Sequence, residues 1–130
     1  MSTDVKSKTF LNSLSASTTS IAAAQTTSGA DNLTLAAAAG TGAFHDTDQA
    51  SKITLTSTGN ISGVDFTITG TDIAGNSLSE VLTGPNNNTV TSTKFYNTVT
   101  QIASDGAVGT NTSAGNAAGT AGGQAVLTAG

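Results

Sequence analysis

Apolar and polar residues alternate along the middle of this chain with the period of two that is typical of a half-buried β-strand. In the stretch 63–70, Val64, Phe66 and Ile68 fall on one face, while Asp65 and two threonines fall on the other. Such alternation predicts a sheet that has one face on a core and the other face in water.

Several further segments are short, rich in Thr and β-branched residues, and separated by Gly, Asn, Asp or Pro clusters. The predicted strands span residues 32–38, 51–57, 63–70, 77–84, 88–93 and 97–104. Strands at this spacing predict an all-β chain folded as an antiparallel β-sandwich.

Turn residues and spacing add local detail to this prediction. The loop "TDIAGN" holds Asp72, Gly75 and Asn76, which favour a turn and predict that the next strand folds back antiparallel. Val99 and Ile102 are three positions apart, so both can face the core only if the strand has a β-bulge, expected near Gln101.

The two ends of the chain differ from its middle. Residues 1–24 are interpreted as an N-terminal arm, residues 25–105 as the sandwich domain, and residues 106–130 as a flexible Gly/Ala-rich segment with one further strand at 124–128. Three apolar residues of the arm are spaced as one short helical face, which is expected to order only against another surface, and plain terminal disorder is the alternative. They are Phe10, Leu11 and Leu14.

Charge and residue types argue against several classes of function. The chain has 4 Lys and no Arg against 8 acidic residues, a net charge of −4, so it has no basic stripe to neutralise nucleic-acid phosphates. The longest apolar run, at 35–39, is too short to cross a bilayer, so no membrane partner is expected. Without cysteine, thiol catalysis and Cys-based zinc sites are excluded.

One cluster could carry metal or acid/base chemistry. The segment "FHDTD" brings the single histidine, His45, next to Asp46 and Asp48. A solvated turn is the favoured interpretation, and a hydrolase that uses His45 and Asp48 is kept only as a third hypothesis. We therefore expect no enzyme activity, no metal and no cofactor.

The aromatic pair Phe95-Tyr96 offers a possible platform for stacking on a sugar. Alternation turns one ring of the pair into the core, which leaves one ring exposed, and core packing is the favoured role of the pair. The strongest loop signal is Gly84-Pro85 followed by three asparagines, because Pro85 cannot lie inside a central strand.

A resemblance adds to these observations. The runs "QTTSGADNLTL" (25–35) and "ITLTSTGNISGVDFTITGTDIAGNSLSEVLTGPNNNTVTSTKFYNTVTQI" (53–102) resemble small virion proteins of tailed bacteriophages, most specifically in "FTITGTD", "GN" and "TGPN…TVTST". The resemblance implies an immunoglobulin-like β-sandwich on a capsid or tail, with a decoration (cement) or fibre role. It implies no catalytic residues.

Besides the hydrolase, the sequence thus leads to two principal hypotheses. The first is a virion protein on the capsid surface that binds the major capsid protein and itself, as a dimer or trimer, with a thin core that gains stability on docking. The second is a tail- or fibre-borne sandwich that binds host-surface glycans through Tyr96 or the tip of the Asn-rich loop. The candidate contact residues are Phe10, Leu11, Leu14, Pro85, Asn86, Asn87, Asn88 and Tyr96.

Overall fold

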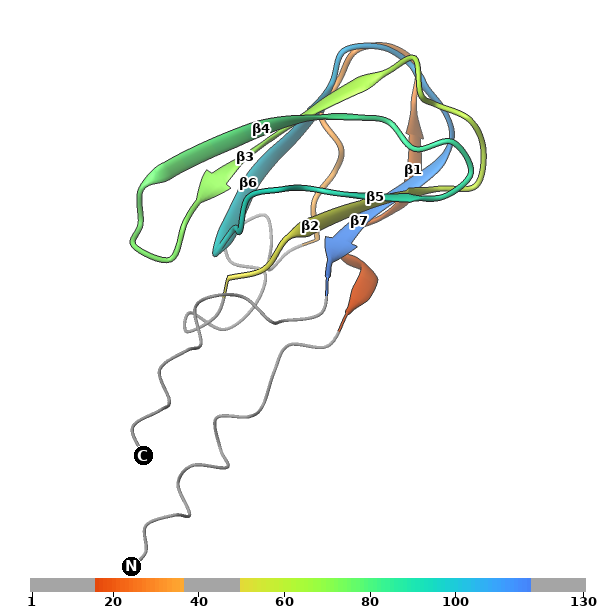
Figure 1. Ribbon diagram of the computed structural model, residues 1–130. Coiled ribbons are helices and arrows are strands. Elements are labelled where there is room, and N and C mark those ends of the chain that lie inside the picture. The colour runs from red at the N-terminus through yellow and green to blue at the C-terminus, as the bar shows by residue number, and fades with distance from the viewer. Residues whose placement is uncertain (1–15, 37–49, 118–130) are drawn as a thin grey trace, which may run out of the picture.

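The computed structural model describes residues 16–36 and 50–117 of the chain, and these residues form strands and loops without a helix (Figure 1). The strands are β1 (Ser17–Thr27), β2 (Ile53–Ser57), β3 (Asp65–Thr71), β4 (Ser77–Thr83), β5 (Thr89–Thr91), β6 (Thr98–Ser104) and β7 (Val108–Asn116).

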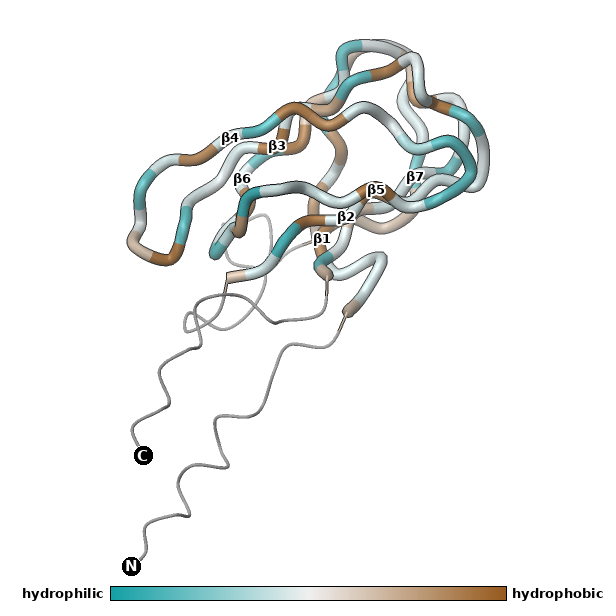
Figure 2. Tube along the Cα trace, in the orientation of Figure 1, coloured by the Kyte–Doolittle hydropathy of each residue, from teal (hydrophilic) through white to brown (hydrophobic). Residues whose placement is uncertain are grey.

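The strands form two antiparallel sheets that lie in two layers (Figure 1). The four-stranded sheet has the order β1-β7-β2-β5, and the three-stranded sheet has the order β4-β3-β6. The predicted antiparallel β-sandwich is therefore confirmed. Apolar positions alternate with polar ones along β3, as Figure 2 shows in brown against white and teal, and along β4 the burial of the side chains alternates.

The core lies between the sheets and takes side chains from both. Phe66 and Ile68 of β3 are fully buried, as are Ile53 and Leu55 of β2. Burial of side chains of this size stabilises a fold by about 1.5–3 kcal/mol each. The remaining apolar core positions are smaller or come from loops and other strands: Ile21, Ala22, Leu33, Ile61, Tyr96, Val99, Ile102, Val108 and Ala114.

Five of the predicted strands are present as β2 to β6, but the strand predicted at 32–38 is wrong for the part that is described. Asn32 makes only an isolated bridge to Ala103, and Leu33 is buried in a loop. The backbone N–H of Leu33 donates to the carbonyl of Ile102 at 2.8 Å, so one leucine anchors this loop to β6. Residues 37 and 38 lie outside the described residues.

The folded unit also covers more residues than the domain predicted at 25–105, since its strands run from Ser17 to Asn116. Strand β1 begins at Ser17, inside the predicted arm, and β7 covers 108–116, inside the segment predicted to be flexible. Strand β7 lies between β1 and β2, and its last five residues are all buried. Neither strand was predicted from the sequence, because a strand made of Gly, Ala, Ser and Thr shows little alternation of hydrophobic and polar residues. The strand predicted at 124–128 falls outside the described residues.

Close backbone packing explains why such small residues form a central strand. Ser17 pairs with Asn116, but the next partners are Ala22 and Ala114, so β1 makes a wide bulge against β7. At this bulge β1 lies directly over Gly115, and a Cβ atom there would lie 1.8 Å from the carbonyl oxygen of Ser17. Only glycine allows this approach of two backbones.

The two local predictions in the three-stranded sheet are confirmed. Strands β3 and β4 form an antiparallel ladder from Asp65↔Thr83 to Thr71↔Ser77, closed by the loop at 72–76. On β6 the pairing shifts between Gln101 and Val99, which leaves Thr100 as the extra residue of a β-bulge next to Gln101. The bulge turns both Val99 and Ile102 into the core, where both are fully buried.

Candidate functional site

The loop at 84–88 presents asparagines to solvent from a fixed backbone. Asn86, Asn87 and Asn88 are exposed, and Asn87 takes the left-handed conformation with φ 55°. The N–H of Asn87 donates to the carbonyl of Gly59 at 2.7 Å, and the N–H of Asn86 donates to Oδ1 of Asn88 at 2.9 Å. Pro85 is fully buried, so its inclusion among the contact residues is corrected: it anchors the loop.

The aromatic pair divides between core and surface. Tyr96 is 0 % exposed, and its hydroxyl donates to the carbonyl of Ile68 at 3.1 Å. Burial, and secondarily the charge of Glu80, raises the pKa of Tyr96 well above its usual value. Tyr96 therefore cannot stack on a ligand, and its proposed contact role is corrected to core packing. The exposed ring is Phe95, 39 % exposed, with Nζ of Lys52 at 5.3 Å from the ring centroid.

Glu80 ties the edge of the three-stranded sheet to the loop between β5 and β6. Its carboxylate accepts the backbone N–H of Thr93 at 2.8 Å and that of Lys94 at 3.0 Å, and the Thr93 hydroxyl donates to it at 3.1 Å. Nζ of Lys94 in turn donates to the carbonyl of Ser79 at 2.8 Å. We call this set the Glu80 clamp. It fixes the segment that carries Phe95 and Tyr96.

Glu80→Gln is expected to loosen this clamp, because an amide can offer only one acceptor oxygen to two backbone donors. The free energy of unfolding should fall by roughly 1 kcal/mol, discounted for partial exposure. Amide exchange of Thr93 and Lys94 should also speed up. Asp65→Asn is the matched control, since it makes the same charge change at an exposed carboxylate on the neighbouring strand β3. Equal exchange in both variants would rule the clamp out.

The β3–β4 turn is organised by Asp72. Its Oδ1 accepts the backbone N–H groups of Asn76 and Ala74, both at 2.9 Å, and Gly75 adopts φ +88°. These bonds, that of Asn76 first, hold the pKa of the Asp72 carboxyl below its usual value of 3.8. The turn carries Ile73 at its tip, 47 % exposed.

The lowered pKa of Asp72 predicts how the stability of the fold changes with pH. Because the carboxyl is more acidic when folded than when unfolded, its stabilisation is present above pH 3.8 and is lost as pH falls through the folded pKa. The difference in Tm between wild type and Asp72→Asn should therefore shrink as pH is lowered from about 5 to about 2. NMR titration of the carboxyl should give a midpoint below 3.8, and a midpoint at or above that value would contradict the assignment.

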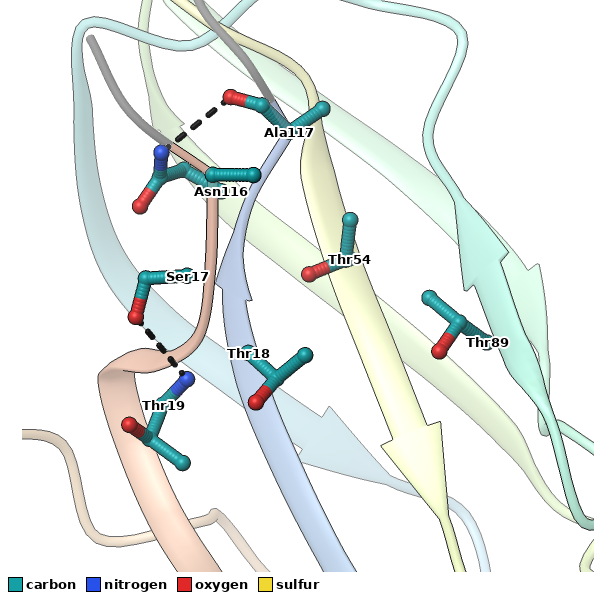
Figure 3. Close-up of a pocket in the computed structure, with 8 residues that line it drawn as sticks. Ser17, Thr18, Thr19, Thr54, Thr89, Asn116 and Ala117 are labelled. Atoms are coloured by element: carbon teal, nitrogen blue, oxygen red, sulfur yellow. Dashed lines mark hydrogen bonds between the residues drawn. The ribbon is translucent and has the colours of Figure 1, made fainter.

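A shallow groove of about 550 Å³ lies on the outer face of the four-stranded sheet (Figure 3). Figure 3 shows Thr54 on β2 and Thr89 on β5, with Thr18 of the β1 bulge beside them. Thr54 is 8 % exposed, and its Oγ1 has no hydrogen-bond partner among the described residues. The lining is neutral and consists of small side chains: Ala16, Ser17, Thr18, Thr19, Thr54, Thr89, Asn116 and Ala117.

The groove is also the place where the described chain begins and ends. Ala16 and Ala117 both line it, so residues 1–15 and 118–130 attach to the sandwich at one site. Phe10, Leu11 and Leu14 fall within the first of these segments and lie outside the described residues. No pattern in the sequence predicts the groove, because the groove is formed by the β1 bulge, which depends on Gly115.

The remaining sequence candidates do not enter this site. His45, Asp46 and Asp48 lie outside the described residues. Across 16–36 and 50–117, no group of three or more His, Cys, Asp or Glu side chains is arranged to hold a metal ion. Nor does this part of the chain contain a helix of the length and apolar character that a membrane span requires.

Comparison of the chain with protein-family models, with curated proteins and with solved structures finds no match.

Proposed function

We propose that this chain is a structural virion protein that decorates the outer surface of an icosahedral phage head and binds the major capsid protein there. The resemblance of residues 25–35 and 53–102 to small phage virion proteins motivates the proposal. The observation that carries it is the hydroxyl-rich outer face of the three-stranded sheet, on which Asp65 and Val81 are also exposed. Its hydroxyl residues are Thr67, Thr69, Thr71, Ser77, Ser79, Thr83, Thr98 and Thr100.

Such a face is suited to broad contact with another protein. The hydroxyls of Thr71 and Thr98 lie 2.6 Å apart, and the Thr100 hydroxyl donates to the carbonyl of Thr69 at 3.2 Å. Short side chains that already bond to one another lose little conformational entropy when they are covered. Each contact is weak, but repetition over the symmetric shell multiplies it.

The terminal segments supply the second part of the proposal. Both leave the sandwich at the groove, so both can reach the same neighbouring capsomer. A segment that orders on docking covers a large area without needing a core of its own. We assign Phe10, Leu11 and Leu14 as the apolar contacts of the N-terminal segment with the shell, and Asn86 to Asn88 as a second contact.

The alternative, a tail- or fibre-borne module that binds glycans, is supported less well. Burial of Tyr96 removes the ring on which a sugar was expected to stack. The exposed Asn86 to Asn88 tip remains, and Phe95 offers only a partly exposed ring near the ammonium of Lys52. No described aromatic side chain offers a fully open face to a sugar.

A rebinding assay tests the proposal. Purified protein is mixed with stripped heads, and separately with isolated tails, of a phage that carries the gene, and each mixture is sedimented. We expect wild type to pellet with heads, the triple variant Phe10→Ala/Leu11→Ala/Leu14→Ala to stay in solution, and Asn86→Ala to bind more weakly than wild type. Failure of wild type to pellet with heads would refute the proposal, and pelleting with tails alone would favour the alternative.

A further inference from the structure

Three of the four sheet edges carry features that discourage pairing with another chain. β1 has several register shifts, and β5 is only three residues long. β6 has a bulge at Thr100 and is covered by the loop at 31–33, whose Asp31 carbonyl accepts the N–H of Ser104 at 2.8 Å. Bulges, short strands and covering loops are the usual protection of edges.

The fourth edge, β4, is seven residues long and regular, and its neighbour is the loop between β5 and β6, whose Lys94 Nζ donates to the Ser79 carbonyl. It pairs with β3 over seven residues without a register shift, and no strand in the described residues pairs with its other side. It contains no Pro and no Lys. Val81 is 59 % exposed, the largest value among the exposed large hydrophobic residues. A regular, exposed edge of this kind is a template for strand addition.

The hydrogen-bond register shows which backbone groups of β4 are unused. The N–H of Gly84 donates to the carbonyl of Val64 at 2.8 Å, and the N–H of Asp72 donates to that of Asn76 at 3.0 Å. Because antiparallel bonding alternates, the even-numbered residues of β4 bond to β3 and the odd-numbered residues point their peptide groups outward. The bond from Lys94 Nζ to the Ser79 carbonyl, on the outer side, agrees with this assignment. Lys94 has to release this carbonyl before it can accept a bond from a second copy.

We propose that β4 pairs antiparallel with β4 of a second copy of this chain, across a two-fold axis at Val81. The outward residues Ser77, Ser79, Val81 and Thr83 are all neutral, so the edge is compatible with itself. In this register Val81 faces Val81 of the second copy, and Ser79 faces Thr83. β-Branched pairs of this kind stabilise neighbouring strands.

Charge selects this register over its neighbours. Glu80 points to the other face of the strand and lies opposite Leu82 of the second copy when the axis is at Val81. An axis at Glu80 would place two carboxylates directly opposite each other, which is unfavourable. An axis at Ser79 would pair Val81 with Ser77 and lose the apolar contact. The result is one continuous six-stranded sheet built from two copies, and this inference does not depend on head binding.

The test is the mass and amide exchange of the purified full chain. Sedimentation velocity should give twice the chain mass of 12.6 kDa for wild type, and Val81→Lys should raise the dissociation constant at least about 10-fold. Thr91→Lys, which adds the same charge to exposed β5, should dimerise like wild type. Dimer formation should protect the amides of Ser79, Val81 and Thr83.

Three results would overturn the proposal. The first is a monomer at every concentration at which the protein stays soluble. The second is a dimer that Val81→Lys leaves as tight as wild type while circular dichroism shows both proteins folded. The third is a dimer in which the odd-numbered β4 amides exchange as fast as in dilute monomer. If Val81→Lys fails to fold, the exchange of these amides in wild type still decides the proposal.

Discussion

Gly115→Ala is expected to lower the free energy of unfolding by about 3 kcal/mol, which would make it one of the most damaging single-methyl changes in the chain. The added Cβ would lie 1.8 Å from the carbonyl oxygen of Ser17 and 2.7 Å from the carbonyl carbons of Ser17 and Thr18. These are backbone atoms and cannot rotate away, so β1 has to separate from β7. Urea unfolding measures the loss.

Gly109→Ala is the matched control for this prediction. Gly109 lies on the same strand, but no atom lies within 4 Å of a Cβ built there. The replacement should leave stability within about 0.5 kcal/mol of wild type or raise it slightly, because alanine has less freedom to lose on folding. Equal losses for Gly115→Ala and Gly109→Ala would show that β1 does not cross β7 as described.

Tyr96→Ala is expected to cost about 4 kcal/mol, since it removes the largest fully buried side chain of the core. Domains of this size unfold at about 5–15 kcal/mol, so the variant should be largely unfolded at moderate urea concentrations. Tyr96→Phe removes only the hydroxyl that donates to the Ile68 carbonyl and should cost about 1 kcal/mol. Thermal and urea unfolding by circular dichroism report both losses.

The neighbouring ring provides the control. Phe95→Ala should cost less than about 1 kcal/mol, because Phe95 is 39 % exposed and its ring has the ammonium of Lys52 at 5.3 Å from its centroid. A larger loss for Phe95→Ala than for Tyr96→Ala would reverse the assignment of core and surface ring. Such a result would return Tyr96 to the surface as a candidate for stacking on a sugar.

The centre of the fold was predictable because its strands carry large side chains in strict alternation. Phe66 and Ile68 of β3 both point inward, and the turn residues around Gly75 fix the hairpin that follows. The spacing of Val99 and Ile102 alone predicted the bulge beside Gln101. In these segments, local pattern and tertiary packing agree.

The strands β1 and β7, which stand first and last among the described strands, were not predictable for a definite physical reason. In β7, Gly115 fits because β1 crosses above it, and this depends on a strand nearly one hundred positions earlier in the chain. The reverse error occurred in the described part of the predicted strand at 32–38, residues 32–36, where an apolar run suggested a strand but Leu33 anchors a loop. Small residues carry little hydrophobic signal, so such contacts between distant segments decide their structure.

Of the candidate surfaces, too, some follow from the local sequence and others depend on contacts between distant segments. The exposure of Asn86 to Asn88 follows from the turn signal that begins at Pro85, and the sequence predicted it. The groove at Ala16 and Ala117 and the clamp at Glu80 arise from contacts between segments far apart in the chain. One feature of the sequence did indicate a special role for Glu80, because this charged residue stands between Leu78 and Leu82 on the inward face of β4.

The central claim is that this sandwich works by covering the outside of a phage head. Electron microscopy of purified virions, labelled with a gold-conjugated antibody raised against the folded chain, tests the claim most directly. The account predicts gold particles distributed over the head surface. Virions without label, with the chain also missing from their protein gel, or gold confined to the tail, would contradict it.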